Sequence, residues 1–361
     1  MASLQLALLA SGAVIIAAVL AFNVLQSWQL RRRRRGAEAN ATLADVTDVD
    51  GAERREPDLG DSALDADGAR PRSSAPRIDP LIDAIASFLF DQPLPGSALI
   101  ERLPRSARAG AKPLLFEGRS AVDGRWEALQ PQVRYAELQA AVQLASRNGA
   151  LNAIEFSEFV TKCHALGEAL GTAPDLPDMG EVLEHARDLD TFAAANDAQL
   201  SINLQAQGVA WGVDYLRQQA QAAGFAAGAG AGRLALLETV GDAEDGAAPA
   251  ASADGHRLLA LVQLQYDAQA DLSDDPQLPV SRATLLLDVA QVPQALRPFA
   301  RMRDAAQRLA QALPARQVDD NGAPLSSASL DQIELQLDRL YAALDARGLP
   351  AGSAAAQRLF S

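Results

Sequence analysis

The sequence predicts an α+β protein: an N-terminal transmembrane helix, a disordered linker, and two antiparallel-sheet domains with helices on one face. Three observations lead to this prediction. A long uncharged apolar run near the start is followed closely by a block of arginines, a stretch without periodicity comes next, and short apolar strands then alternate with helical stretches from residue 80 onward. Adjacent strands joined by short turns pair antiparallel, which favours helices packed on one face of each sheet.

Residues 1–28 are predicted to form a transmembrane anchor. Between Leu4 and Phe22 no side chain is charged. A helix of this length rises about 28 Å, close to the hydrocarbon thickness of a bilayer. Basic residues beside a span stay in the cytoplasm, so the charge asymmetry predicts one span with the N-terminus outside and the rest of the chain inside. The residues that set this topology are the interfacial Trp28 and the run Arg31, Arg32, Arg33, Arg34 and Arg35.

Two other interpretations of the arginine run agree less well with the sequence. A cleaved signal peptide carries its basic residues before the apolar core, whereas here they follow it. Nucleic-acid binding would need a second basic region, but the chain has a formal net charge of −14. Anionic headgroups lie within a Debye length of the run. We therefore expect membrane lipids, and not nucleic acid, to contact the N-terminal segment.

Residues 29–79 consist of the basic segment beside the membrane and an acidic linker that follows it. From residue 36 to residue 79 the chain is rich in Asp, Glu, Ala, Gly and Pro and has neither helical nor strand periodicity. Such a composition cannot bury enough apolar surface to offset the entropy that ordering would remove. We expect a disordered tether that spans roughly 35–40 Å on average as a flexible coil.

Residues 80–194 are predicted to form an accessory α+β domain. Short apolar runs between turn signals predict strands, and apolar residues three or four positions apart predict helices. The expected elements are a strand at 81–90, a short helix after Pro95, strands at 113–119, 125–130 and 134–146, and helices at 153–170 and 179–195.

Residues 195–361 repeat this order of elements. The expected elements are a strand at 198–205, a helix at 212–223, strands at 233–239, 257–266 and 282–289, and helices at 294–313 and 329–347. The two helical segments that begin near Phe156 and Phe299 also align at several apolar positions. The shared order is consistent with an internal duplication, in which the accessory domain is a degenerate repeat. It is equally consistent with two unrelated domains.

A search for catalytic or metal-binding side chains gives little. His164, His185 and His256 are the only histidines, and no pair of histidines or of cysteine and histidine has ligand spacing. Cys163, the only cysteine, excludes an internal disulfide, agrees with a reducing compartment and lies on an apolar helical stripe as a core residue. We therefore expect no enzyme activity, no metal and no cofactor.

Two further motifs are better explained by structure than by ligand binding. The glycines of residues 224–236 lie between a helix and a strand, the reverse of the order in a dinucleotide-binding loop, and no G-K-[ST] sequence accompanies them. Asp319 and Asp320 precede Asn321-Gly322, a tight-turn signal, and are predicted to be solvated. Neither motif indicates a small-molecule substrate.

The strands of the second domain are apolar on both faces. In residues 257–266, both alternating sets are largely apolar. We expect Leu285 and Leu287 to face the helices, while Leu286 shares the far face with Val262, Leu264 and Tyr266. Either the two domains pack together through this far face, or it is an open groove for a peptide.

Several segments of the second domain follow one another in a recognisable order. They are "LSINL", "YLRQQAQAAGF", "TLLLDV", "FARMRDAAQRLAQAL", "VDDNGAPLS" and "IELQLDRLYAAL". No single one of them is diagnostic, but in this order they resemble the C-terminal domain of the ZipA family of bacterial division proteins. The resemblance covers residues 196–361 and the plan of the N-terminus: an outward end, one anchor, basic residues inside and a linker.

The resemblance implies a docking protein of the inner membrane at the division site. Domains of this family hold the C-terminal tail of FtsZ, a tubulin-like GTPase, in a shallow apolar groove on a sheet face. Gln199, Ser201 and Asn203 would make one wall of the groove polar, where the family can place branched apolar residues. The positions implied for partner binding are Val262, Leu264, Tyr266, Leu286, Leu234, Leu236 and Ser201.

Two alternatives stay open at this point. A membrane-anchored scaffold for another cytoplasmic partner would share every feature except the ligand. A membrane-bound hydrolase would need a catalytic role for His164, His185 or Asp320. The sequence leaves the role of residues 80–194 open.

Overall fold

The computed structural model describes residues 77–228, 230–240, 257–267 and 278–361, all within one compact unit. The predicted anchor and nearly all of the predicted linker therefore lie outside the described residues. Within these ranges, no helix has the length and apolar character that crossing a bilayer requires.

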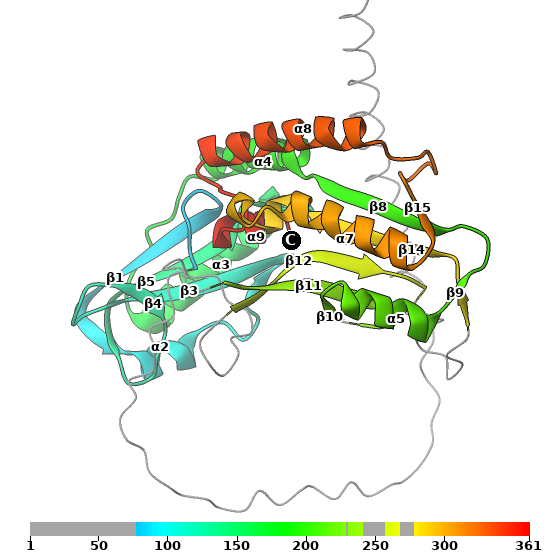
Figure 1. The fold of residues 1–361 in the computed structure, drawn as a ribbon. Helices are drawn as coiled ribbons and strands as arrows, with labels where there is room; N and C mark the ends of the chain where they lie inside the picture. Colours follow the sequence, from blue (N-terminus) through cyan, green and yellow to red (C-terminus); the bar gives the residue numbers. More distant parts are fainter. Residues whose placement is uncertain (1–76, 229, 241–256, 268–277) are drawn as a thin grey trace, which may run out of the picture. The chain divides into compact units, whose positions relative to one another are not determined.

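The first half of the described chain is an α+β layer (Figure 1). Its main sheet has the strand order β1-β5-β3-β2, with β4 paired to β3, and every pairing is antiparallel. The elements are β1 (Asp83–Pro95), α2 (Gly96–Arg102), β2 (Arg108–Ala109), β3 (Lys112–Ser120), β4 (Trp126–Ala128), β5 (Arg134–Gln143), β6 (Ala145–Ser146), β7 (Gly149–Ala150), α3 (Ala153–Leu170) and α4 (Met179–Asn196).

Local signals at its ends define α3. The side chain of Asn152 accepts hydrogen bonds from the backbone amides of Ile154 and Glu155, and the Glu155 carboxylate accepts one from the Asn152 backbone amide, which forms a capping box. Gly171 ends the helix in the left-handed conformation that glycine adopts without strain. The buried stripe of α3 packs on β3 and β5 and consists of Phe156, Phe159, Cys163 and Leu166.

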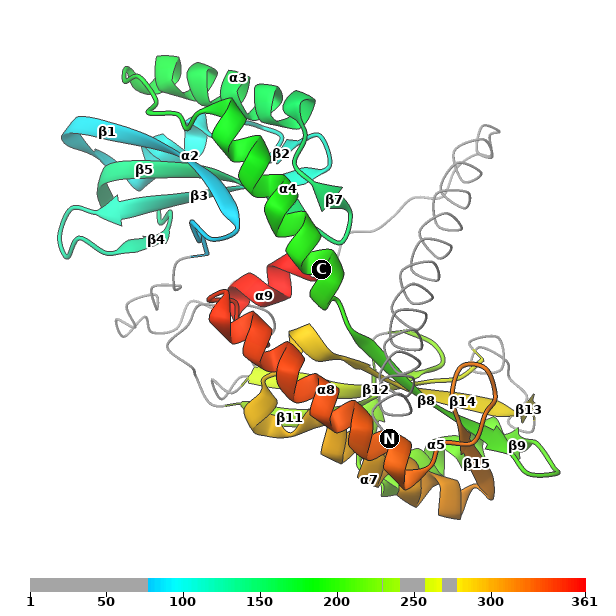
Figure 2. The ribbon, with the colours of Figure 1, turned by 90° about the horizontal axis from the view of Figure 1, so that it is seen from above.

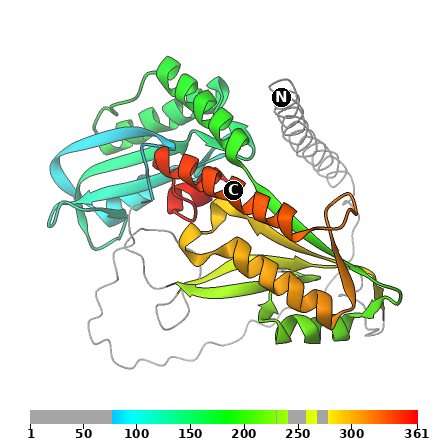
Figure 3. The same cartoon turned by 45° about the horizontal axis from the view of Figure 1, so that its top comes forward.

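The second half is a six-stranded antiparallel sheet in the order β10-β11-β12-β14-β8-β15. Figure 3 shows α7 and α8 running beside one another along it. Arg303 of α7 joins the two helices through ion pairs with Asp331 (2.8 Å) and Glu334 (2.9 Å) of α8. The elements are β8 (Gln199–Ala206), β9 (Trp211–Gly212), α5 (Val213–Ala222), β10 (Phe225–Ala227), β11 (Arg233–Val240), β12 (Arg257–Gln265), β13 (Pro279–Val280), β14 (Arg282–Asp288), α7 (Pro298–Ala312), β15 (Ala315–Val318), α8 (Ser327–Ala346) and α9 (Ala354–Leu359).

The α+β prediction is confirmed, and most elements lie within a few residues of their expected positions. One predicted helix is shorter than expected. Residues 294–313 were expected as one helix, but α7 begins only at Pro298, after short 3-10 turns at Val289–Gln291 and Gln294–Leu296. The edge strands β10 and β15 fall in segments for which the sequence predicted connections.

The two sheets share a strand order. In the first, β1-β5-β3-β2 follows the same path as β8-β14-β12-β11 in the second, and each is followed by two long helices. Aligned helix positions are also buried in both halves: Phe156 with Phe299, and Leu166 with Leu309. A duplication would leave this arrangement, and it stays a hypothesis.

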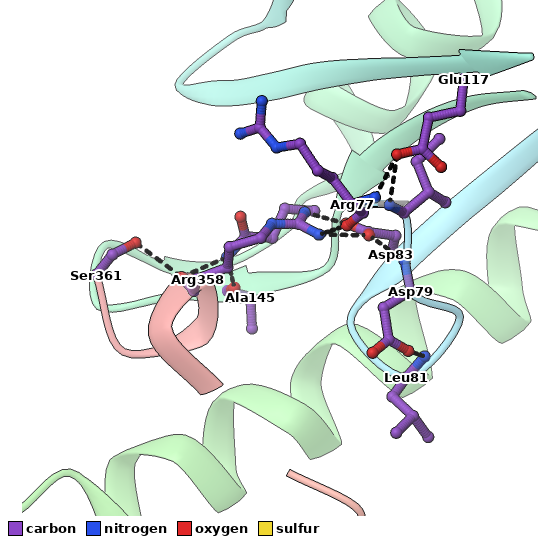
Figure 4. A network of polar contacts seen from close by, with 10 residues as sticks. Arg77, Asp79, Leu81, Asp83, Glu117, Ala145, Arg358 and Ser361 are labelled. Atoms are coloured by element: carbon purple, nitrogen blue, oxygen red, sulfur yellow. Dashed lines mark hydrogen bonds and ion pairs between the residues drawn. The ribbon is translucent and has the colours of Figure 1, made fainter. Parts of the chain in front are cut away.

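The two halves meet through α4 and α8 and through α9, as the view from above makes visible (Figure 2). Arg358 of α9 forms an ion pair with Asp83 of β1 at 2.5 Å and donates to the carbonyl of Arg77 at 2.6 Å (Figure 4). In return, Arg147 from the β6–β7 turn pairs with Asp288 of β14 at 2.6 Å. Each half therefore supplies an arginine to a carboxylate at the end of a strand in the other half.

Candidate docking face of the second sheet

The strand register assigns each residue of the second sheet to one of its two faces. Leu264 pairs with Leu234 on one side and with Leu285 on the other, and Leu285 pairs with Ile202. Directly paired residues point to the same side of a sheet. All four side chains are buried, and α7 packs over β8, β12 and β14, which carry three of them. This is the helix-covered face.

The predicted groove therefore needs a correction. Val262 and Leu264 are 0% exposed and lie beneath the helices together with Leu234, not on an open surface. Leu236, which pairs with Val262, packs against the same core. Tyr266 points to the same side, because its hydroxyl oxygen accepts a hydrogen bond at 3.1 Å from Nε of Arg217 in α5. Of the seven residues implied for partner binding, these five are on the wrong face.

The error has a physical cause in β12. Both alternating sets of this strand are apolar near its start, and a bulge between Leu236 and Leu237 of β11 changes the alternation there. Past the bulge, the polar residues Gln263 and Gln265 mark the face that meets solvent. Gln263 pairs with Leu286, so the sequence carried a usable signal in these two glutamines.

Leu286 and Ser201 do lie on the open face, where the prediction placed them. They are direct partners across β14 and β8, both are half-buried, and Gln263 of β12 completes the row. Leu287 and Leu285, on either side of Leu286, are buried beneath the helices as expected. The open face of this sheet is therefore centred on Leu286.

On the other side of the bulge, toward the start of β12, more apolar residues continue the open face. Glu238 of β11 forms an ion pair with Arg301 of α7, which places Glu238 on the helix side. Its neighbour Leu237 therefore points to the open side, where it pairs with Ala260. Leu258, two residues before Ala260, is 50% exposed. We call Leu286, Leu237, Ala260 and Leu258 the docking strip.

A polar network closes the open face at β8. Asp320, in the turn after β15, accepts hydrogen bonds from Ser201 Oγ (2.7 Å) and from Asn203 Nδ2 (2.8 Å). Thr284 Oγ1 donates to Asn203 Oδ1 at 2.7 Å. The predicted turn at Asp319 is confirmed by its side chain, which accepts from the backbone of Asn321. Asp320 is exposed but, contrary to expectation, has partners on the sheet.

The described residues carry little that indicates catalysis. Within them, no three His, Cys, Asp or Glu side chains gather in a way that could hold a metal ion. His164 and His185 are exposed on α3 and α4, and His256 lies outside the described residues. Burial raises the pKa of Cys163 to about 12, so its thiol stays protonated at neutral pH. The open face of the second sheet instead carries the docking strip and, beside it on β8, the polar network around Asp320.

Comparison with known protein families gives a match in the second half of the chain. Residues 251–336 match the family described as "ZipA, C-terminal FtsZ-binding domain". The matched region contains β12, β14, α7 and β15, and thus the strand that carries Leu286 and one of its two neighbours, whereas the other neighbour, β8, lies outside it. A comparison with curated proteins gives no match. The family is one of protein-binding domains, and residues 251–336, in the second half of this chain, are similar to it.

Proposed function

We propose that this chain is a cell division protein that binds the C-terminal tail of FtsZ on the open face of its second sheet and thereby holds the FtsZ ring at the membrane. The family match over residues 251–336 supports FtsZ as the partner. The observation that carries the site is the apolar docking strip on the open face, from half-buried Leu286 to exposed Leu258, which lies in or beside the matched region. We propose docking without catalysis.

Residues 1–28 would supply the membrane attachment. The uncharged run from Leu4 to Phe22 and the arginines after Trp28 support a single span with the docking half in the cytoplasm. Each interaction can then be weak. Many anchored copies facing a filament that displays many tails bind by avidity, and the linker sets the effective concentration.

A binding experiment tests the site. Residues 70–361 should bind an FtsZ tail peptide with a dissociation constant in the micromolar range or weaker. Leu286→Asp places a charge in the centre of the docking strip and should raise this constant more than about tenfold, because the charge would be desolvated on docking. The matched control is Leu335→Asp on the exposed side of α8, where Leu335 is 64% exposed.

Calorimetric titration and thermal unfolding would be measured for all three proteins. Undiminished peptide binding by a folded Leu286→Asp protein would remove the docking strip from the proposal. Absence of binding by the unaltered protein would remove FtsZ as the partner. In dividing cells, the full chain should form a band at midcell, and a uniform membrane signal would contradict a division role.

A further inference from the structure

Three arginines lie on the open face, at the end away from Leu258. Arg282 of β14 and Arg316 of β15 both pair with Gln205 of β8, so the three residues form one row across neighbouring strands. Gln205 is two positions from Asn203 and points to the same side. Arg233 of β11 pairs with Gln265, which in turn pairs with Thr284. We call Arg233, Arg282 and Arg316 the arginine band.

The geometry of the sheet keeps these three side chains close together. Neighbouring strands lie about 4.8 Å apart, so the backbones of Arg282 and Arg316 are separated by roughly 10 Å, and that of Arg233 lies within about 15 Å of Arg282. An arginine side chain can cover much of such a gap. All three residues are exposed. One short peptide can therefore contact the whole band.

The charges of the band are not neutralised by the part of the chain that the structure describes. None of the three arginines forms an ion pair there, although most ion pairs of the described residues involve arginine. Asp320 lies over β8 but is bonded to Ser201 and Asn203. Asp288 is held by Arg147. The arginine band is therefore a positively charged patch on a chain whose net charge is −14.

We propose that the arginine band recognises carboxylates of the docked peptide, so that the ligand is an apolar segment next to an acidic one. This rests on the proposed function, because the band lies on the same face as the docking strip. The apolar part of the peptide contacts Leu286 and its neighbours, and the acidic part lies over the arginines. The band thus contributes to affinity and also fixes the direction in which the peptide lies on the sheet, because complementary charge sets register.

A charge-reversal experiment tests the band in residues 70–361. The double variant Arg282→Glu with Arg316→Glu should raise the dissociation constant of the FtsZ tail peptide about tenfold or more, since exposed pairs contribute up to about fivefold each before repulsion is added. The control is the double variant Arg187→Glu with Arg339→Glu, on α4 and α8, because both residues are exposed and the change in net charge is equal. This control should bind within about twofold of the unaltered protein.

A second peptide allows the effects of changing the protein and of changing the peptide to be compared in a double-mutant cycle. In it, every Asp and Glu of the tail is replaced by Asn and Gln, and its C-terminus is amidated. This peptide should bind the unaltered protein more weakly, with a smaller dependence on salt, and should lose little further affinity with the band variant. If the band variant lost as much affinity for the second peptide as for the first, or lost none for either, the arginine band would have no role in recognising carboxylates. The docking strip would be unaffected by this result. Failure of the unaltered protein to bind either peptide would instead remove the proposed function and the band with it.

Discussion

Glu117 lies on the face of the first sheet away from α3, and its side chain is almost completely buried. Burial raises the pKa of this carboxyl above its ordinary value of 4.5, while hydrogen bonds from the backbone amides of Arg77 and Ile78 act in the opposite direction. The folded protein therefore holds this proton more tightly than the unfolded chain does. Ionisation of Glu117 lowers the free energy of unfolding as pH rises from about 4.5, and the loss persists at neutral pH.

Glu117→Gln should remove this pH dependence and keep a carbonyl oxygen for both amides. The free energy of unfolding of the variant, relative to the unaltered protein, should therefore increase between pH 4 and pH 7. Urea unfolding across this range measures it, with Glu168→Gln on the exposed side of α3 as the control. If the free energy of unfolding of the variant, relative to the unaltered protein, decreased as pH rises, the two backbone hydrogen bonds would have a larger effect on the pKa of Glu117 than its burial has.

At the scale of elements, β8 shows how one strand can carry both a core and a site. Ile202 and Leu204 of this strand are buried beneath the helices, and between them Asn203 turns its amide to the open face. Asn203 is nevertheless only 2% exposed, because the turn after β15 folds over it through Asp320. The polar wall of the docking face is thus also the attachment of that turn.

Asn203→Ala should lower the free energy of unfolding by about 1–3 kcal/mol, because Thr284 and Asp320 lose a partner in a buried position. Gln205→Ala, on the same strand and face but exposed, should change stability by less than about 0.5 kcal/mol. Chemical denaturation of both variants checks the difference. Equal effects would mean that the network contributes nothing beyond what an exposed side chain does.

The elements were largely predictable from the sequence, whereas the faces of one strand were not. Helix periodicity and the cap at Asn152 define α3 locally, so its position follows from the residues themselves. Gln263 and Gln265 mark the open side of β12 only past the bulge, whereas near the start of the strand both sides are apolar and the bulge, which depends on pairing with β11, has no local signal. The arginine band was missed for the same reason, since Arg233, Arg282 and Arg316 become neighbours only through the register of several strands.

At the scale of the molecule, a single apolar core extends through both halves. The C-terminal helix α9 contributes to it with Leu359, and the residue after the helix, Phe360, is fully buried. The ion pair between Arg358 and Asp83 adds a polar link, in which the Asp83 side chain is 0% exposed. We therefore expect the two halves to unfold together.

Arg358→Ala should lower the free energy of unfolding by about 3 kcal/mol, because it leaves the Asp83 carboxylate buried without its cation. The calorimetric transition should also lose cooperativity, as the first half becomes less dependent on the second. Arg339→Ala on α8 is the control, since Arg339 is exposed. A variant that stays as stable and cooperative as the unaltered protein would show that apolar contacts alone join the halves.

The hydrogen bonds at Arg77 determine where a pull on the N-terminal side of the chain is felt. The amide of Arg77 is held by Glu117 of β3, and its carbonyl by Arg358 of α9 (Figure 4). Tension that arrives at this residue is therefore shared at once between a central strand and the far end of the polypeptide. We therefore expect such a pull to load β3 and α9 together before it reaches β1, so that β1 should not separate from its neighbour one residue at a time.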